Sequence, residues 1–365
     1  MATKKLTYGY TTGACATAAA KGAAQMLRDQ RRVDEVELVL PAGEAARFPL
    51  HGQEFTSAGA RCYVVKDAGD DPDVTNGAHV HAAVLLEPGY TGASREIVIE
   101  GGEGVGRVTK PGLAVAVGEW AINPVPRLMI SGAVHEVFAA CHPSGPLRVT
   151  ISIPNGEELA KKTLNARLGI VGGLSILGTT GIVRPVSVEA WTSTIDTAID
   201  VALACGAPGV VLSTGRTSEL VAQRLFMTPA AAGFPEEAFV MMGDHVGYAL
   251  RACARRGVAR VVLAAQFAKL LKIACGHEQT HVASSSLDLG TLAGWVTEEL
   301  GDTGLAGRVA AANTAREVLS DCERRDEIIA LVASRARAFA ERLAPGGAFE
   351  VFLAGYDGEV LYYYH

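Results

Sequence analysis

The chain has 365 residues, more than one hydrophobic core usually supports, and 49% of them are hydrophobic against 20% charged. These numbers favour two globular domains and exclude a disordered protein, while a net charge of −6 disfavours nucleic acid or an anionic membrane as partner. The chain has seven scattered cysteines without a C-x-x-C pair, no apolar leader and no apolar run of spanning length. We therefore expect a cytoplasmic protein.

The first half of the chain predicts an α+β domain over residues 1–188. Thr11, Thr12 and Gly13 precede a run of small residues that predicts a helix, and a threonine hydroxyl can cap its first turn. Strand-like runs that end in Gly, Pro, Asp or Asn follow. The mixture of one early helix and many strands indicates an α+β arrangement.

Three later segments of this domain have distinctive compositions. GGEGVG at residues 101–106 precedes Pro111 rather than a helix, so it predicts a hairpin loop instead of a dinucleotide-binding loop. The prolines of VTKPGLAVAVGEWAINPVPR at residues 108–127 predict an extended, stiff surface crossing. EELAKKTLNARLG predicts a helix that ends at Gly169.

The second half alternates helical and strand-like runs from about residue 189. This pattern predicts a Rossmann-like three-layer α/β domain with a mostly parallel sheet over residues 189–365, closed by a C-terminal hairpin. Ligands of such sheets bind beyond the C-terminal ends of the strands. Those ends carry the loops at residues 213–216, 243–247 and 264–269.

Two motif-like stretches point to other functions. HEQTH matches a zinc-peptidase pattern, in which His277 and His281 would be ligands, Glu278 the base, and Glu298 or Glu299 a third ligand. Gly276 predicts a helix end just before HEQTH, so we expect the motif to lie in a loop. GLSILGTT at residues 173–180 has the glycine spacing of a P-loop, but Thr179 replaces the required lysine, which argues against ATP.

Four segments together resemble the CbiD family of corrinoid (vitamin B12) biosynthesis. They lie in the family's order within the stretch from Leu6 to about His281, and they are YGYTTGACATAAAKGAA, VTKPGLAVAVGEWAINPVPR, ISIPNGEELAKKTLNARLGIVGGLSILGTTGIVRP and GDHVGYAL. The chain departs from the family at Trp120, where proline is expected, and between Ala264 and Lys269. In that loop only Lys269 of a Gly-His-x-Gly-Lys-like pattern is retained, whereas Thr280 and His281 match a Thr-His pair of the family.

The resemblance implies a reaction, in which S-adenosylmethionine methylates ring carbon 1 of cobalt-precorrin-5B to give cobalt-precorrin-6A. Such chemistry requires alignment of donor and acceptor in a dry site, and no protein-bound metal, since the substrate carries its own cobalt. The resemblance assigns no catalytic residue. Two alternatives stay open: a zinc metallopeptidase that uses HEQTH, and a non-catalytic tetrapyrrole-binding module. The expected partner is a small-molecule tetrapyrrole, without nucleic acid or membrane, and a homo-oligomer is compatible with the sequence.

We expect the C-terminal domain to hold the methyl donor, because an acidic residue at a strand end commonly accepts from ribose hydroxyls. The predicted donor-binding residues are Ser213, Gly215, Arg216, Gly243, Asp244 and Gly247. For the substrate, small residues would let a macrocycle approach the backbone, a helix N-terminus would favour a carboxylate, and a basic cluster that includes Lys21 would attract the others. The predicted substrate-binding residues are Thr11, Thr12, Gly13, Lys110, Arg127, Thr179, Thr180, Gly181 and Arg184.

Overall fold

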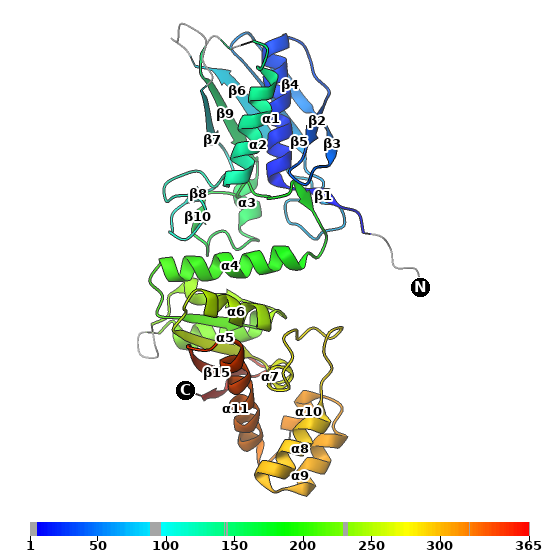
Figure 1. Ribbon diagram of the computed structural model, residues 1–365, viewed down its shortest axis with the longest axis vertical. Coiled ribbons are helices and arrows are strands. Elements are labelled where there is room, and N and C mark those ends of the chain that lie inside the picture. The colour runs from blue at the N-terminus through cyan, green and yellow to red at the C-terminus, as the bar shows by residue number, and fades with distance from the viewer. Residues whose placement is uncertain are drawn as a thin grey trace. The chain divides into compact units, whose positions relative to one another are not determined.

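The computed structural model describes residues 6–87, 96–141, 143, 145–228, 233–320 and 322–364 (Figure 1). Its contacts divide the chain into two compact units, Met1–Ser187 and Val188–His365, called unit 1 and unit 2 below. Each unit combines helices with a sheet of its own, so the mixed α/β class predicted from the sequence is confirmed. Among the described residues, no helix combines the length and hydropathy needed to cross a bilayer.

Unit 1 is built around a five-stranded sheet in the order β4-β5-β6-β9-β7. β7 runs parallel to β9, and the other neighbours are antiparallel. Buried residues alternate with more exposed ones along β6 and β9, because one face of the sheet packs on the core. The strands are β4 (His51–Phe55), β5 (Gly59–Val65), β6 (His79–Leu86), β7 (Ile97–Gly101) and β9 (Leu147–Ser152).

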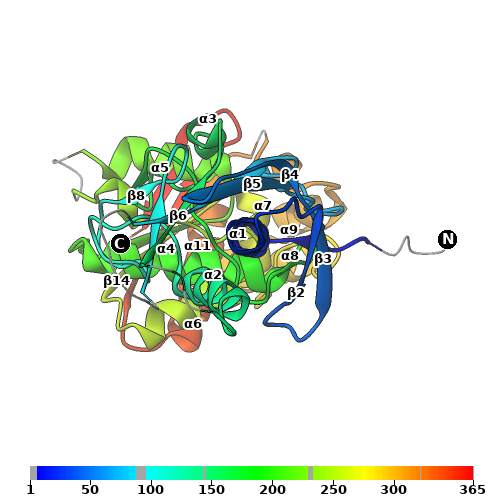
Figure 2. The same cartoon turned by 90° about the horizontal axis from the view of Figure 1, so that it is seen from above.

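Helix α1 (Thr12–Asp29) lies at the centre of unit 1 and buries 15 of its 18 residues. It contacts strands of the sheet on one side and α2 (Pro124–Val137) and β2 (Glu35–Val39) on others, while β2 pairs with β3 (Ala45–Pro49). Figure 2 looks along α1 and shows these elements around it. Alanine and glycine dominate α1 because a helix enclosed from several sides has little room for longer side chains.

Short strands tie the loops of unit 1 together. β1 (Gly9–Tyr10) pairs antiparallel with β11 (Ile182–Val183), which brings the two Thr-Thr-Gly motifs side by side. β8 (Arg107–Val108) pairs with β10 (Ile170–Val171), while β7 pairs with β9. The prediction of a hairpin at GGEGVG is therefore wrong, because the strands on its two sides belong to different sheets.

Two other predictions for this region are also wrong. The helix expected at residues 157–169 ends early, since α3 spans only Gly156–Ala160 and turns follow it. The extended crossing ends at Asn123, because Pro124 stands at the first position of α2, where a missing N–H costs nothing and the fixed φ suits a helix. Arg127 therefore lies on a helix rather than at the end of an extended strap.

Unit 2 holds a second five-stranded sheet in the order β13-β12-β14-β15-β16. The first four strands are parallel, and β16 pairs antiparallel with β15 as the predicted closing hairpin. The order of the parallel strands is that of flavodoxin-type doubly wound sheets, not the longer order of a complete Rossmann fold. The strands are β12 (Val210–Ser213), β13 (Phe239–Met241), β14 (Arg260–Ala265), β15 (Ala348–Ala354) and β16 (Val360–Tyr364).

The chain reverses direction across this sheet at β12. It passes from β12 through α5 (Arg216–Phe226) to β13 and then through α6 (Val246–Arg255) to β14, on the other side of β12. Right-handed crossovers therefore put α5 and α6 on opposite faces, and the carboxyl ends of β12 and β14 are where sheets of this topology bind their ligands. The remaining helices are α4 (Val188–Ala204), α7 (Phe267–Ala274), α8 (Leu289–Leu300), α9 (Thr303–Ala311), α10 (Ala315–Leu319) and α11 (Arg325–Leu343), with a short 3-10 turn at Glu236–Ala238.

Candidate functional sites

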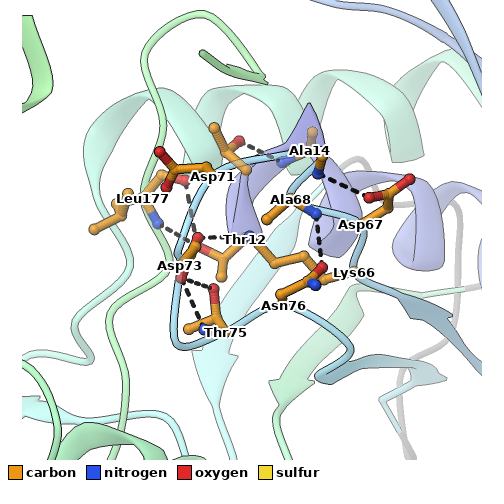
Figure 3. Close-up of polar contacts among 12 residues, drawn as sticks. Thr12, Ala14, Lys66, Asp67, Ala68, Asp71, Asp73, Thr75, Asn76 and Leu177 are labelled. Carbon is orange, nitrogen blue, oxygen red and sulfur yellow. Dashed lines mark hydrogen bonds and ion pairs between the residues drawn. The ribbon is translucent and has the colours of Figure 1, made fainter. Parts of the chain in front are cut away.

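The first candidate site, called the motif junction, comprises residues 7–13, 66–77 and 175–186 of unit 1. Thr12 is buried, and its Oγ1 accepts a 3.0 Å hydrogen bond from the Leu177 N–H and lies 3.3 Å from the Leu177 carbonyl (Figure 3). Gly13 donates its N–H to the same carbonyl at 2.9 Å. A Cβ on Gly13 would lie 2.7 Å from Pro126 Cγ, so only glycine fits there. The first Thr-Thr-Gly motif is thus bonded to the segment that leads into the second.

Thr11 completes this joint between the two motifs. Its hydroxyl caps α1 by accepting from the Ala14 N–H at 3.2 Å, and its own N–H donates to the Gly181 carbonyl at 3.0 Å. The N–H groups of Gly13 and Ala14 therefore already have acceptors in the protein. Residues 11–13 thus pack the two motifs together, and the use of this helix N-terminus for a substrate carboxylate stays a prediction.

The segment KDAGDDPDVTNG at residues 66–77 is the part of the motif junction that sequence analysis missed. Its four aspartates each accept a hydrogen bond from a backbone N–H, as expected of carboxylates in turns. The bonds are Asp67 from Gly69 at 2.8 Å, Asp70 from Thr7 at 2.8 Å, Asp71 from Val186 at 3.0 Å, and Asp73 from Thr75 at 2.7 Å. The spacing of Asp, Gly and Asn along the segment was the signal for this turn-building role.

One of these carboxylates also neutralises a buried cation. Lys66 exposes 1% of its side chain and donates to Asp73 Oδ2 at 2.7 Å (Figure 3). Burial opposes ionisation of Asp73, but hydrogen bonds from Lys66 and Thr75 outweigh it, and the pKa of Asp73 lies below its ordinary value. The loop is therefore held as an ionised, internally satisfied unit.

The predicted basic residues of unit 1 differ in what they can still bind. Arg127 donates through Nε and both terminal nitrogens to the carbonyls of Ile122, Ile99 and Trp120, which uses three of the five N–H groups of its guanidinium. Lys110 donates to the Arg167 carbonyl at 3.2 Å. The bonds to backbone carbonyls hold the Arg127 side chain in place, and its pairing with a substrate carboxylate stays a prediction.

The other two cations lie at opposite extremes of exposure. Lys21 is buried in an ion pair with Glu136 at 2.9 Å, so it does not belong to a substrate-facing cluster. Arg184 is exposed and lies over the Tyr8 ring at 5.8 Å. Thr179 and Thr180 are exposed as well, whereas Gly181 is buried against Leu40 with φ +83°.

The second candidate site, called the sheet edge, comprises residues 213–216, 242–247, 266–269 and 278–281 of unit 2, at and near the carboxyl ends of the parallel strands. Ser213 ends β12, is fully buried, and its Oγ has no hydrogen-bond partner among the described residues. Gly215 caps α5 and has open space where a Cβ would stand. Arg216 is largely exposed and pairs with buried Glu219 at 3.1 Å. An unsatisfied buried hydroxyl beside a helix N-terminus is the kind of feature that ligand sites contain.

Asp244 follows β13 and lies in a polar cluster. Its Oδ1 is ion-paired with Lys269 and accepts from the Thr280 hydroxyl at 2.7 Å. Within the described part of the chain, Oδ2 receives no hydrogen bond. Burial opposes ionisation, but the bonds from Lys269 and Thr280 outweigh it and lower the pKa of Asp244. Lys269, noted in the sequence only as a retained family residue, thus holds the predicted ribose acceptor in its charged form.

The HEQTH stretch lies beside this cluster in a loop, not on a helix. Glu278 accepts two 2.6 Å hydrogen bonds from Arg251, and its carbonyl accepts from the Gly247 N–H. A Cβ on Gly247 would meet the Glu278 side chain at 2.6 Å, so Gly247 is a packing position rather than an open donor contact. Among the described residues no three side chains of His, Cys, Asp or Glu form a group that could hold a metal ion.

Comparisons with known proteins give one consistent result. Family models described as CbiD and as the CbiD C-terminal domain match residues 1–185 and 279–365. Proteins named cobalt-precorrin-5B C(1)-methyltransferase from Geobacter metallireducens and Geobacter sulfurreducens are each 62% identical, over 100% of both chains. The protein of that name from Priestia megaterium is 45% identical over 86% of this chain and 83% of its own. A crystal structure of a cobalamin biosynthesis protein from Archaeoglobus fulgidus is 30% identical, over 73% of this chain and 79% of that one, with a TM-score of 0.38.

Proposed function

The chain belongs to the CbiD family, and we propose that it is a methyltransferase that methylates ring carbon 1 of cobalt-precorrin-5B, with S-adenosylmethionine as the donor. The observation that carries this proposal is the similarity, over the whole chain, to enzymes of that name. The product would be cobalt-precorrin-6A. Seven free thiols support a cytoplasmic location as part of the same proposal.

The reaction requires the protein mainly to position the methyl donor and the tetrapyrrole relative to each other. The donor's sulfonium already activates its methyl group, which leaves without its bonding electrons as the ring carbon supplies a pair for the new C–C bond. The sulfur keeps its electrons and becomes the neutral thioether of S-adenosylhomocysteine. The protein must hold sulfur, methyl and carbon in line and exclude water, and a resident metal has no part in these steps.

The sheet edge is the proposed place of the donor. Ser213 Oγ lacks a partner among the described residues, Gly215 leaves space at the N-terminus of α5, and Asp244 Oδ2 is free to accept from a ribose diol. Gly243 lies between these groups in the loop that follows β13, and Arg216 stands at the first turn of α5. All of these residues follow the carboxyl ends of parallel strands, where doubly wound sheets bind their ligands.

The exposed part of the motif junction is the proposed binding surface for the tetrapyrrole. Tyr8 and Leu177 expose 56% and 48% of their surface. Thr179 and Thr180 are exposed shortly after Leu177 in the chain, and Arg184 is exposed and lies over the Tyr8 ring. The apolar residues suit the face of a macrocycle, and an arginine without a carboxylate partner among the described residues suits one of its acid groups. Lys110, which donates to the Arg167 carbonyl, is the further cation proposed for this surface.

The experiment that tests the function uses purified full-length protein, cobalt-precorrin-5B and a donor with an isotopically labelled methyl group. We expect the label in the tetrapyrrole and one S-adenosylhomocysteine for each product. Absence of transfer under conditions where a homologous enzyme is active would refute the proposal. Retention of label in a product methylated at another carbon would refute the position but not the class of reaction.

The donor site is tested by titrating S-adenosylhomocysteine into variants of Asp244. We expect Asp244→Asn to weaken binding by roughly 1.5–3 kcal/mol, the contribution of a hydrogen bond to a charged group. Asp326→Asn is the matched control, because this aspartate is 83% exposed on α11 of the same unit. Equal affinities of wild type and Asp244→Asn would remove Asp244 from the donor site.

A further inference from the structure

The indole of Trp191 lies against the sheet edge. Trp191 belongs to α4, and its Nε1–H donates to the Met242 carbonyl at 3.1 Å, which fixes the ring. A Cβ on Gly243 would stand 2.9 Å from Trp191 Cζ2, so the ring packs directly on the backbone that follows β13. Gly243 has φ +58° and is suited to this conformation. Despite these contacts Trp191 exposes 46% of its surface.

The loop under the indole is tied to the unsatisfied serine. The Ser213 carbonyl accepts from the N–H groups of Met242 and Gly243 at 3.0 and 3.2 Å. The indole, the buried Ser213 hydroxyl and the Asp244 carboxylate are therefore linked through one short loop. The aromatic surface belongs to the same edge as the groups proposed to hold the donor.

A second aromatic ring extends this surface. The His245 imidazole lies 6.2 Å from the Trp191 ring, centroid to centroid, with 34° between their planes, and its Nδ1 is 2.8 Å from the Gln279 amide. Burial lowers the pKa of His245 in spite of the neighbouring Asp244 charge. This direction favours the neutral imidazole, and the two rings form an aromatic surface beside a carboxylate.

We propose that Trp191 and His245 bind the adenine base of the methyl donor, an inference that rests on the proposed function's placement of the donor at the sheet edge. A purine matches one indole in area and stacks on it, while Asp244 Oδ2 accepts from the ribose diol next to the base. A polycarboxylate macrocycle suits this edge less, because the Asp244 charge would repel its acid groups and one indole covers little of its face.

The test is a titration of S-adenosylhomocysteine, and separately of adenosine, into wild type, Trp191→Phe and Trp191→Leu. We expect Trp191→Leu to weaken both ligands by roughly tenfold or more, the loss of one base–aromatic stack, and Trp191→Phe to retain most of the affinity. Wild-type tryptophan fluorescence should be quenched on binding. The matched control is Trp295→Leu, which removes the other tryptophan of unit 2, packed under Arg335 at 4.4 Å.

The outcomes separate this inference from the function on which it rests. If wild type fails to bind S-adenosylhomocysteine, both the proposed donor site and the proposed adenine-binding role of Trp191 and His245 are overturned. If wild type binds S-adenosylhomocysteine and Trp191→Leu binds it as tightly as the control Trp295→Leu does, only the proposed adenine-binding role of Trp191 and His245 is overturned. Loss of tetrapyrrole binding in Trp191→Leu with unchanged adenosine binding also overturns it, because the surface would then hold the substrate. Trp191→Phe keeps an aromatic ring in the same packing and guards against a folding defect.

Discussion

At the motif junction the polar groups bond to one another and to the backbone, whereas at the sheet edge a hydroxyl and a carboxylate oxygen lack partners among the described residues and an indole stays half exposed. The first region carries the most conspicuous motifs of the sequence, and the second carries inconspicuous ones. Dense polar motifs therefore do not by themselves mark ligand contacts. Groups that the protein leaves unsatisfied are the better guide, because a ligand can offset their cost.

This contrast separates stability from binding. Substitutions at the buried part of the motif junction should lower the stability of unit 1, because each polar group there serves a partner in the protein. Substitutions of the sheet-edge groups that lack a partner among the described residues should change donor affinity with little effect on stability. The following experiments test this difference between the two regions.

The largest expected effect comes from Asp73→Asn. It leaves Lys66 buried without a charged partner, a change that typically costs about 3–5 kcal/mol. Because the chain has two units, the measurement is hydrogen exchange of unit 1 peptides under increasing urea rather than one global unfolding curve. The control is Asp34→Asn, which breaks an exposed pair with Arg32 and should cost less than about 1 kcal/mol. Equal effects of the two substitutions would contradict a buried, internally satisfied junction.

The same carboxylate gives a pH dependence with a definite sign. The pKa of Asp73 is lower in the folded protein than its ordinary value of about 3.9, so its contribution is fully present above that value. The contribution is lost as the pH falls through the folded pKa and Asp73 becomes protonated. Wild-type unit 1 should therefore lose stability below about pH 4, and this loss should be smaller in Asp73→Asn.

The next effect in size is that of Gly13→Ala, at about 1–3 kcal/mol of destabilisation, because the new methyl group would overlap Pro126 and crowd the Leu177 carbonyl. Gly132→Ala is the matched control, since Gly132 lies within α2 with nothing inside 4 Å of its absent Cβ. That substitution should stabilise the helix by up to about 1 kcal/mol. Thermal unfolding distinguishes the two, and the same sign for both would contradict close contact between α1 and residue 177.

A smaller effect, of opposite sign, is expected for Ser213→Ala. Removal of a buried hydroxyl without a partner should leave stability unchanged or raise it by about 1 kcal/mol, because its desolvation is no longer uncompensated. Affinity for S-adenosylhomocysteine should nevertheless fall if the donor supplies the missing partner. Thermal unfolding and calorimetry on the same samples check both parts. Reduced stability with unchanged affinity would assign Ser213 to the protein core.

The sequence predicted the local features of the fold better than the long-range ones. Alternation of helix and strand predicted the parallel sheet of unit 2, and the Tyr-Asp-Gly turn predicted the final hairpin. Strand order was not predictable in detail, because pairing depends on contacts distant in the chain. GGEGVG was mistaken for a hairpin for the same reason. A Cβ on Gly104 would lie 1.9 Å from the Ile153 carbonyl oxygen, so that loop approaches a distant backbone that no local pattern indicates.

In the candidate sites, too, the contacts between residues distant in the chain could not be predicted from the sequence. Residue type correctly marked Asp244 as a carboxylate at a strand end, but its ion pair with Lys269 depends on the packing of α7. Arg127 was predicted to bind substrate because it is a cation in a motif, but a sequence cannot show that three of its N–H groups donate to backbone carbonyls. Trp191 escaped notice altogether, since only the folded chain brings α4 against the loop after β13.

The smallest effect is expected for Glu278→Gln, which concerns the HEQTH stretch at the border of the sheet edge. Glu278 and Arg251 form an ion pair in which each side chain is nearly half exposed, so solvent screens their attraction and the loss should be about 0.2–1 kcal/mol. The hydrogen bond from Arg251 lowers the pKa of Glu278, which makes the carboxylate a poor proton acceptor rather than a poised base. Methyl transfer and donor affinity should therefore be unchanged in Glu278→Gln, and elemental analysis should find well under one zinc per chain in wild type. Loss of activity in this variant, or stoichiometric zinc that disappears in His281→Ala, would make HEQTH a functional motif. The HEQTH loop would then belong to the functional groups of the sheet edge.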